Sequence, residues 1–533
     1  MAQRPVREYL LEKIGKVVKL EHPEIEKRGD YSFYTTDKDV MIKEDEVIEK
    51  VERVGGFVNI WLKNDVLVNQ IDEVIRRGQQ YGGSTGGSGK RVIIDYSAPN
   101  IAKPFGIGHL RSTIIGQALY NLYKFCGWDV VGDNHLGDWG TQFGKLIFMI
   151  KNTDTADYSI DNLEKLYVEF HKHAEWEDEG RKWFKKLEEG DAEAKEIWEK
   201  CVKVSMAEFD RIYELLGVKI DAAFGESFYE DMMIGVIEEA KRKGVMHESE
   251  GAGVIEIPGI KTPLMLLKSD GGTTYATRDL ATLKFRREKW DPDMVIYEVG
   301  AEQGLHFEQV FAAANMLGYI KEGERLVHTK HGLYLDMDGK KFATRKGKTI
   351  KLEEVLEEAI ERARKLGNTD QAQAVGIGAI KYFDLMHSVQ SNIVFDWEKM
   401  MNLQGNSGPY LQYTHARIES VIRQGGKLME RYNLSNYRVN KEEERVVKMI
   451  YRFGEVVEES ASRLAPNLLC GYLFELAQRF NTFYNKHSIL TPTGAAEEER
   501  GRTREFRLAM TKATGIIIRN GLTLLGIEAP GRM

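Results

Sequence analysis

The order strand, glycine-rich loop, helix, strand within residues 91–132 constrains the fold of this chain more than any other feature. The β-rich run RVIIDY begins at Arg91, and a second one, WDVVG, follows Gly127. Between them, apolar residues recur at every fourth position from Leu110 to Leu122, as in a helix. A strand–helix–strand crossover joins parallel strands. The sequence therefore predicts an α/β fold with a doubly wound, Rossmann-like parallel sheet, whose ligands bind at the carboxyl ends of the strands.

A Gly/Ser-rich segment, YGGSTGGSGK at residues 81–90, is the clearest domain boundary. A chain of 533 residues is too long for a single hydrophobic core. Highly charged helical sequence fills the stretch near 150–220, and from about residue 353 onward the pattern is almost wholly helical. We expect a small α+β domain at 1–82, a flexible linker at 83–90, the α/β domain at 91–365 with a helical insertion near 150–220, and an all-α bundle at 366–533.

Composition excludes several classes of protein. With 42% hydrophobic and 29% charged residues, the chain is expected to be globular, and no apolar run approaches the length of a membrane span. Three cysteines lie far apart without CxxC spacing, which argues against a zinc site or a disulfide framework and favours the reducing cytoplasm. The net charge of −7 does not indicate nucleic-acid binding, so any such contact must use local basic patches.

The loop at 99–108 has the features of a phosphate-binding site. Gly106 and Gly108 allow close approach of the backbone to a ligand, and the following helix presents free N–H groups and a partial positive charge. Lys103 and His109 add donors that could stabilise a departing pyrophosphate. A glycine-rich turn that merely begins a core helix fits the spacing equally well.

A second cationic element, GKKFATRKGKTI, covers residues 339–350. Such a loop can close over a triphosphate and then release it. Taken alone, a solvated basic loop explains it better. Its five cations are Lys340, Lys341, Arg345, Lys346 and Lys348.

Five ordered sequence blocks together resemble one enzyme family. SAPNIAKPFGIGHLRST resembles the first signature of class I aminoacyl-tRNA synthetases in its arginyl form, and GKKFATRKG resembles their second signature, the KMSKS loop. Three further blocks are similar to arginyl-tRNA synthetases in particular: NHLGDWGTQFG (134–144), TTYATRDLAT (273–282) and GNSGPYLQYTHARI (405–418). The resemblance implies ATP-dependent attachment of L-arginine to the 3′ end of tRNA(Arg) through an arginyl-adenylate. It also implies Mg²⁺ with the ATP, no zinc, and activation only when tRNA is bound.

The catalytic residues follow from the two signatures. Gly106 occupies a position where the family usually has histidine, and Arg345 replaces the usual lysine of the second signature. In arginyl enzymes a lysine just upstream of the first signature is thought to compensate, and Lys103 occupies that position. The resemblance implies catalytic roles for Lys103, His109, Lys341, Arg345 and Lys346, and ATP binding by Gly106, Gly108, His109 and Lys341.

An arginine pocket needs carboxylates, because only planar charged acceptors satisfy the fork of guanidinium N–H groups. The resemblance makes Asp279 the main partner and Asp129 the second carboxylate. A helix N-cap remains an alternative for Asp279, and a turn at a strand end for Asp129. The resemblance adds Tyr275 and Gln303 as neutral walls, and Asn100 and Asn134 for the α-amino and carboxylate end.

Two surfaces are expected to contact tRNA. The N-terminal unit resembles the arginyl-specific domain that contacts the D-loop, with Phe57 and Asn59 facing an unstacked base. A core position for Phe57 is an equally good reading. The C-terminal bundle resembles an anticodon-binding domain, in which Tyr413 and Arg417 are candidate contacts, although ordinary packing explains either one. We expect a monomer.

Two other functions fit part of the pattern. Another class I synthetase, such as a cysteinyl or glutaminyl enzyme, would share the signatures, but the cysteinyl enzyme needs zinc ligands that three scattered cysteines do not provide. A non-catalytic tRNA-binding relative with a decayed first signature is supported only by Gly106.

Overall fold

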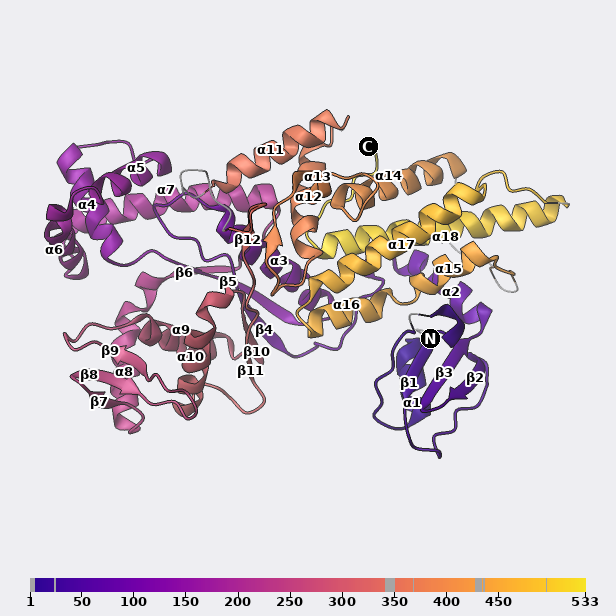
Figure 1. The fold of residues 1–533 in the computed structure, drawn as a ribbon, viewed down its shortest axis with the longest axis horizontal. Helices are drawn as coiled ribbons and strands as arrows, with labels where there is room; N and C mark the ends of the chain where they lie inside the picture. Colours follow the sequence, from indigo (N-terminus) through magenta and orange to yellow (C-terminus); the bar gives the residue numbers. More distant parts are fainter. Residues whose placement is uncertain are drawn as a thin grey trace.

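The computed structural model describes residues 5–23, 25–340, 350–367, 369–426, 434, 437–494 and 496–533. Its central sheet is parallel throughout, in the order β11-β10-β4-β5-β6 (Figure 1). The predicted α/β class and parallel sheet are confirmed. Because β5 and β10 flank β4 on opposite sides, the carboxyl ends of β4 and β10 form the switch point at which such sheets bind ligands. The strands are β4 (Arg91–Asp95), β5 (Asp129–Leu136), β6 (Ala222–Gly225), β10 (Met294–Tyr297) and β11 (Arg325–His328).

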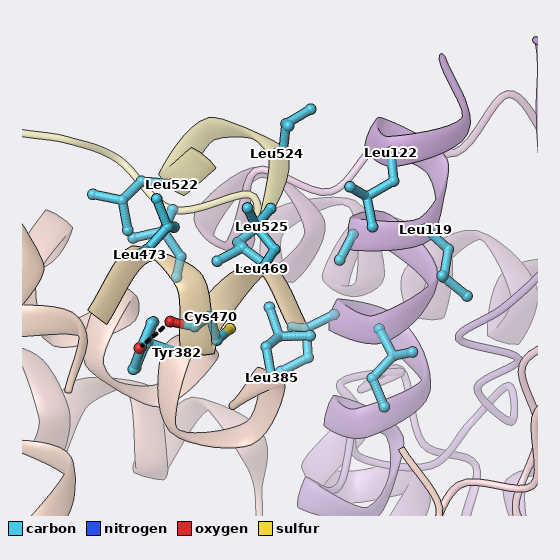
Figure 2. Packing of buried hydrophobic residues seen from close by; sticks show 14 of the residues in the cluster. Leu119, Leu122, Tyr382, Leu385, Leu469, Cys470, Leu473, Leu522, Leu524 and Leu525 are labelled. Atoms are coloured by element: carbon cyan, nitrogen blue, oxygen red, sulfur yellow. Dashed lines mark hydrogen bonds between the residues drawn. The ribbon is translucent and has the colours of Figure 1, made fainter. Parts of the chain in front are cut away.

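Helix α3 (Leu110–Phe125) lies between this sheet and the C-terminal helices. It is buried on nearly all sides, as expected of a helix that is covered on both faces. Figure 2 shows Leu122 of α3 on the side toward Leu385, Leu469 and Leu525 of the bundle, and these side chains and Leu119 are buried. The α/β domain and the bundle therefore share one continuous core.

The stretch between β5 and β6 is wholly helical, and a smaller antiparallel sheet follows β6. Its order is β7-β8-β9, with strands His247–Ser249, Ala252–Ile255 and Leu264–Leu267. The inserted helices are α4 (Thr141–Thr153), α5 (Ile160–Phe170), α6 (Glu177–Glu188) and α7 (Ala192–Leu216). Three more helices pack near the small sheet: α8 (Glu230–Arg242), α9 (Tyr275–Trp290) and α10 (Gly304–Met316).

The N-terminal domain is a three-stranded antiparallel sheet, β1-β3-β2, with two helices. It rests against α16 (Phe453–Ser462), where Glu455 is 3.1 Å from Arg7, 3.2 Å from His22 and also bonded by Tyr31. These contacts fix the domain against the bundle. Its elements are α1 (Val6–Ile14), β1 (Tyr31–Tyr34), β2 (Ile48–Val54), β3 (Phe57–Leu62) and α2 (Asn64–Arg77).

The Gly/Ser segment that joins this domain to the sheet packs against side chains of the sheet domain and of the helical bundle. A Cβ at Gly82 would lie 2.4 Å from the Phe453 ring, and one at Gly87 would lie 2.0 Å from the Trp128 ring. The Ser84 amide donates to the Phe125 carbonyl at 3.2 Å. The expectation of a flexible linker is therefore wrong, because these glycines make room for neighbouring rings.

The C-terminal part is all-helical, as predicted, and the last residues run along α14. Gln412 and His415 of α14 bond the carbonyls of Glu528 (2.8 Å) and Pro530 (3.0 Å). Within the described residues, no helix is long and apolar enough to cross a membrane. The helices are α11 (Leu352–Lys365), α12 (Ala372–Leu385), α13 (Trp397–Met400), α14 (Gly408–Gly425), α15 (Lys441–Ile450), α16, α17 (Pro466–Lys486) and α18 (Glu497–Leu524); β12 (Tyr334–Leu335) pairs with β13 (Ile393–Val394).

Candidate active site

The loop that leaves the carboxyl end of β4 is strained. Ser97, Ala98 and Ala102 have positive φ angles of 77°, 46° and 60°, which residues other than glycine rarely adopt. Such strain persists only where the surroundings hold it, and here each amide donates to a side chain. The acceptors are Ser112 Oγ (2.9 Å), Asn134 Oδ1 (3.0 Å) and Ser205 Oγ (2.8 Å).

His109 ends the short 3₁₀ turn Ile107–His109 and is the N-cap residue of α3. Burial lowers its pKa, as do the charges of His331 and Lys103, against an opposing hydrogen bond to the Ser97 backbone. The ring is therefore a neutral donor near pH 7. Lys103 is half-buried, with its ammonium 5.2 Å from the centroid of the Tyr167 ring, and Gly108 is exposed.

The chain just after the basic loop pairs with this first loop. The amide of Ile107 donates to the carbonyl of Ile350 at 2.9 Å, and the Leu352 amide donates to the Phe105 carbonyl at 2.8 Å. The buried Gly106 lies within this pairing. Three predicted catalytic residues, Lys341, Arg345 and Lys346, lie outside the described residues.

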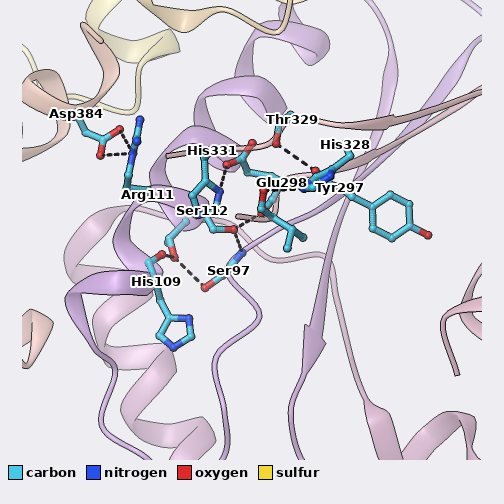
Figure 3. Close-up of polar contacts among 12 residues, drawn as sticks. Ser97, His109, Arg111, Ser112, Tyr297, Glu298, His328, Thr329, His331 and Asp384 are labelled. Atoms are coloured by element: carbon cyan, nitrogen blue, oxygen red, sulfur yellow. Dashed lines mark hydrogen bonds and ion pairs between the residues drawn. The ribbon is translucent and has the colours of Figure 1, made fainter. Parts of the chain in front are cut away.

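A buried polar network joins α3 to the carboxyl end of β10 (Figure 3). Ser112 Oγ donates to the Glu298 carbonyl at 2.5 Å, and the Glu298 carboxylate is 2.8 Å from His331 Nδ1. On the other side of α3, Arg111 pairs with Asp384 of α12 at 3.1 Å, with both side chains almost fully buried. The signature helix is thus held from both sides.

Asp279 is the fifth residue of α9, whose N-cap is Thr274, so the capping alternative is wrong. Its side chain is 22% exposed and lies 2.5 Å from Nε2 of His306 on α10. Burial opposes a charge on His306, but the hydrogen bond and charge of Asp279 raise its pKa above the ordinary value. Asp279 therefore already faces a group that can carry positive charge.

A second carboxylate near Asp279 was missed by the sequence reasoning. Glu226 begins the 3₁₀ turn directly after β6, and burial raises its pKa to about 7. That value includes the opposing charge of Arg278, 3.4 Å away, which lowers the pKa, and the smaller contributions of Asp138 and Asp279, which raise it. Carboxylates that disfavour one another's ionisation favour a cation between them. The available signal was a Glu directly after the short strand-like run AAFG.

Gly225, which precedes this glutamate, is required by close packing. A Cβ there would lie 2.0 Å from the Asp138 carboxylate, which accepts from the Ser227 amide (2.8 Å) and hydroxyl (2.6 Å). Asp138 thereby holds the turn that carries Glu226.

The remaining pocket candidates fall into two groups. Asn134 is fully buried at the end of β5, and Asn100 is half-buried and bridges to Gly137 beside it. Tyr275, 69% exposed, begins α9, and Gln303 is exposed just before α10. The first group lies beside the strained loop, and the second lies at the starts of α9 and α10, the two helices that carry Asp279 and His306.

Asp129 does not join either group. It is the first residue of β5 and Asn134 is the sixth, so about 16 Å of strand separates them. Its side chain is 59% exposed and pairs with Arg91 at 2.6 Å. Asp129 therefore lies at the amino end of the sheet, and its assignment to the arginine pocket is wrong.

The N-terminal candidates line a cavity of about 1140 Å³ between that domain and α16. Phe57 is 50% exposed and packs edge-on against Tyr34, with ring centroids 5.3 Å apart, so its core alternative is wrong. Asn59 is 4% exposed and accepts from Ser32 Oγ at 2.9 Å. Basic residues around the cavity are Arg7, Lys19, Lys27, Arg28 and Arg463.

The bundle candidates form an aromatic–arginine cluster on α14 and α17. The Arg417 guanidinium lies 4.9 Å from the ring centroid of Tyr413 and 5.0 Å from that of Tyr484. It also donates to Asn481 at 2.6 Å, while Tyr413 stays 43% exposed.

Family models, curated relatives and a solved structure all match this chain to the same enzyme family, and together they cover nearly its whole length. Residues 70–397 match the family model of the catalytic domain of class I tRNA synthetases (R), and residues 411–533 match the DALR anticodon binding domain. An arginine–tRNA ligase of Exiguobacterium sibiricum is 40% identical over 96% of this chain and 95% of its own. Arginine–tRNA ligase 1 of Bacillus cereus is 41% identical over 92% and 88%. The solved arginyl-tRNA synthetase of Thermus thermophilus shares the fold, with a TM-score of 0.85 at 24% identity over 99% of this chain and 100% of that one.

Proposed function

Because the chain belongs to the arginyl-tRNA synthetase family and is an ATP-dependent arginine–tRNA ligase, we propose that Asp279 and Glu226 bind the guanidinium of arginine. The observation that carries this proposal is the electrostatic coupling of the two half-buried carboxylates, one with a pKa raised to about 7. A guanidinium between them would give Glu226 a second cationic partner beside Arg278, favour its ionised form and satisfy its own N–H fork. Glu226 thus takes the role that the sequence assigned to Asp129.

The other end of arginine is proposed to lie toward the strained loop. Asn134 and Asn100 are at the carboxyl end of β5 and beside it, where amide groups can hold an α-amino group and a carboxylate. Tyr275 and Gln303 stand at the starts of α9 and α10, on the guanidinium side, as walls of the pocket.

ATP is proposed to lie along the first turn of α3. Gly106, Gly108 and His109 supply close backbone approach and neutral donors, and Lys103 supplies a mobile charge. The motif adds Lys341, Arg345 and Lys346 from the basic loop. Mg²⁺ is proposed to enter with ATP, where it neutralises phosphate charge, and to need no dedicated protein cage. Within the described part of the chain, no group of three His, Cys, Asp or Glu side chains could hold a metal.

The reaction proceeds by positioning and charge stabilisation. The arginine carboxylate attacks the α-phosphorus of ATP, the bond to pyrophosphate breaks, and arginyl-adenylate forms. A hydroxyl of the terminal tRNA ribose then attacks the arginyl carbonyl, and AMP leaves. His109 and the basic groups stabilise charge on the departing pyrophosphate.

For tRNA, we propose two contacts: the D-loop at Phe57 and Asn59, and the anticodon arm at Tyr413 and Arg417. The first is supported by the half-exposed ring of Phe57 in the cavity beside α16, and the second by the exposed aromatic–arginine cluster. We place the second domain boundary near residue 400, since β13 still pairs with β12 and the catalytic family match reaches 397. The protein is proposed to be monomeric and to work in the cytoplasm, where free buried cysteines such as Cys201 stay reduced.

Activation is proposed to require bound tRNA. The test is arginine-dependent exchange of pyrophosphate into ATP, measured with and without tRNA(Arg). We expect little exchange without tRNA and clear exchange with it. Equal exchange in both conditions would contradict tRNA dependence. Periodate-oxidised tRNA, which cannot accept arginine, serves as the control that separates activation from transfer.

A further inference from the structure

The hydroxyl of Tyr213, on the inserted helix α7, lies between two parts of the proposed arginine site. It is 2.8 Å from Ser97 Oγ and accepts from Asn134 Nδ2 at 3.0 Å. We propose that Tyr213 is a positioning residue for arginine activation, which holds Asn134 and the strained loop in the geometry that binds the α-amino and carboxylate groups of arginine. The proposal rests on the role assigned above to Asn134 and the loop.

These bonds close a ring of contacts. Asn134 Oδ1 accepts from the Ala98 amide at 3.0 Å, its Nδ2 donates to Tyr213, and Tyr213 returns to Ser97, the neighbour of Ala98 in the chain. Ser97 and Ala98 both have positive φ, so this ring holds a conformation that would otherwise relax. Removing the one hydroxyl opens the ring at two bonds.

Asn134 depends on this hydroxyl more than an exposed residue would. Its side chain is fully buried, so water cannot replace a lost partner of Nδ2. An amide with an unpaired nitrogen can rotate, and rotation would also release the Ala98 amide from Oδ1. A single hydroxyl therefore controls the orientation of the amide and the shape of the loop.

Helix α7 is rigid enough to serve as a support. Phe105 of the signature loop packs edge-on against Phe209 (5.6 Å) and Tyr213 (5.8 Å). The last residue of the helix, Leu216, has its carbonyl bonded by the buried ammonium of Lys381 on α12. Burial raises the pKa of Tyr213 to about 12, against weaker opposing bonds to Ser97 and Asn134, so the hydroxyl keeps its proton at working pH. The insertion thus forms part of the arginine site.

The test compares Tyr213→Phe with Tyr472→Phe. Tyr472 is equally buried (6% against 5%), and its hydroxyl also makes a buried bond, to the Met449 carbonyl at 2.8 Å, but it lies in the helical bundle. We expect similar small losses of thermal stability from both. Only Tyr213→Phe should lower kcat/KM for arginine, by about tenfold, in tRNA-supported pyrophosphate exchange, since a buried amide loses its partner. Arginine kinetics equal to those of Tyr472→Phe would overturn the proposal.

A double-mutant cycle with Ser97→Ala separates positioning from general stability. If Tyr213 acts through Ser97, the double variant loses kcat/KM by less than the product of the single losses, whereas Ser97→Ala combined with Tyr472→Phe gives the full product. If the Tyr213→Phe, Ser97→Ala double variant also loses the full product of the single losses, the two residues act independently and the proposed ring of hydrogen bonds is contradicted. Asp279→Asn tests the guanidinium assignment separately. If Asp279→Asn leaves kcat/KM for arginine unchanged while Tyr213→Phe lowers it, the guanidinium assignment is refuted and this proposal stands.

Discussion

His306 Nε2 and Asp279 Oδ2 lie 2.5 Å apart, so the carboxylate that we assign to the arginine guanidinium already holds a side chain that can carry positive charge. The pKa of His306 is raised by this partner in spite of its burial. Arginine must displace the imidazole or share the carboxylate with it. This contact supports the proposed role of Asp279 as a partner for a cationic group.

Asp279→Asn tests the main guanidinium partner. The substitution removes a charge and keeps the shape, so kcat/KM for arginine should fall. The fall should correspond to a loss of transition-state stabilisation on the order of 3 kcal/mol, with the KM for ATP little changed. Steady-state aminoacylation at varied arginine measures this loss. Asp129→Asn is the matched control, because Asp129 lies at the other end of the sheet and pairs with half-buried Arg91. Near-normal arginine kinetics for Asp279→Asn would remove Asp279 from the pocket.

Acid pH should weaken arginine use. The pKa of Glu226 in the free protein is raised to about 7, mainly by burial, so below pH 7 its carboxyl is protonated and neutral. Since kcat/KM reports groups of the free enzyme, its value for arginine should fall about tenfold from pH 8 to pH 6. Protonation of His306 in the same direction adds competition for Asp279.

The control for this pH effect is Glu226→Gln, which should show low kcat/KM for arginine at every pH and a flatter profile. If the Gln variant keeps the wild-type fall between pH 8 and pH 6, another group is responsible and Glu226 is not the second carboxylate.

Lys103→Ala tests the phosphate site. If Lys103 supplies the ammonium that is missing where Arg345 replaces a signature lysine, its loss in Lys103→Ala should lower the activation rate on the order of 100-fold, with tRNA affinity near normal. Lys90→Ala is the matched control, since Lys90 also lies over an aromatic ring, that of Trp128 at 5.5 Å, but away from the site. A mild Lys103→Ala with a severe Lys346→Ala would move the role to the basic loop; two mild variants would contradict the assignment of both.

Phe57→Ala and Asn59→Ala should differ in whether they change only the KM for tRNA or the thermal stability as well. Phe57 is half exposed, so its loss should raise the KM for tRNA about tenfold, as expected for one base-stacking partner, without a change in Tm. Asn59 is buried and bonded by Ser32, so its loss should lower Tm as well. A tRNA(Arg) with an abasic nucleotide at that D-loop position serves as the control: wild type should lose affinity for it, and Phe57→Ala should be indifferent. Unchanged tRNA KM in Phe57→Ala would refute the stacking contact.

Arg286→Met should destabilise the sheet domain. Arg286 is fully buried on α9 and bonds both Asp133 (2.8 Å) and Asp95 (2.7 Å) at the ends of β5 and β4. Its removal leaves two buried carboxylates without their partner, at a cost of about 3–5 kcal/mol. Urea unfolding followed by circular dichroism measures this loss. The adjacent Arg287→Met breaks only a surface pair with Asp291, worth about 0–1 kcal/mol; equal losses from both variants would show that the buried triad contributes little.

The sequence alone determined the elements whose signals are local. The alternation of short apolar runs and helical spacing between Arg91 and Gly132 specified a parallel sheet, because a crossover of that kind has one common outcome. The glycine-rich loop before α3 was a candidate phosphate site from its residue types, and the block around Asp279 was a candidate through its resemblance to arginyl enzymes; both roles stay predictions.

Only the tertiary structure decided which distant residues meet. Asp129 and Asn134 are five residues apart in sequence, yet a strand carries them to opposite edges of the sheet, while Glu226 reaches Asp279 from another segment. The glycines near Gly87 predicted a flexible segment, whereas in the structure the Trp128 ring packs against Gly87. Tyr213 contacts Asn134 across 79 residues of chain, and no local pattern predicts that bond. Local sequence restricts backbone angles and spacing, whereas contacts between remote segments depend on how the helices and strands pack together.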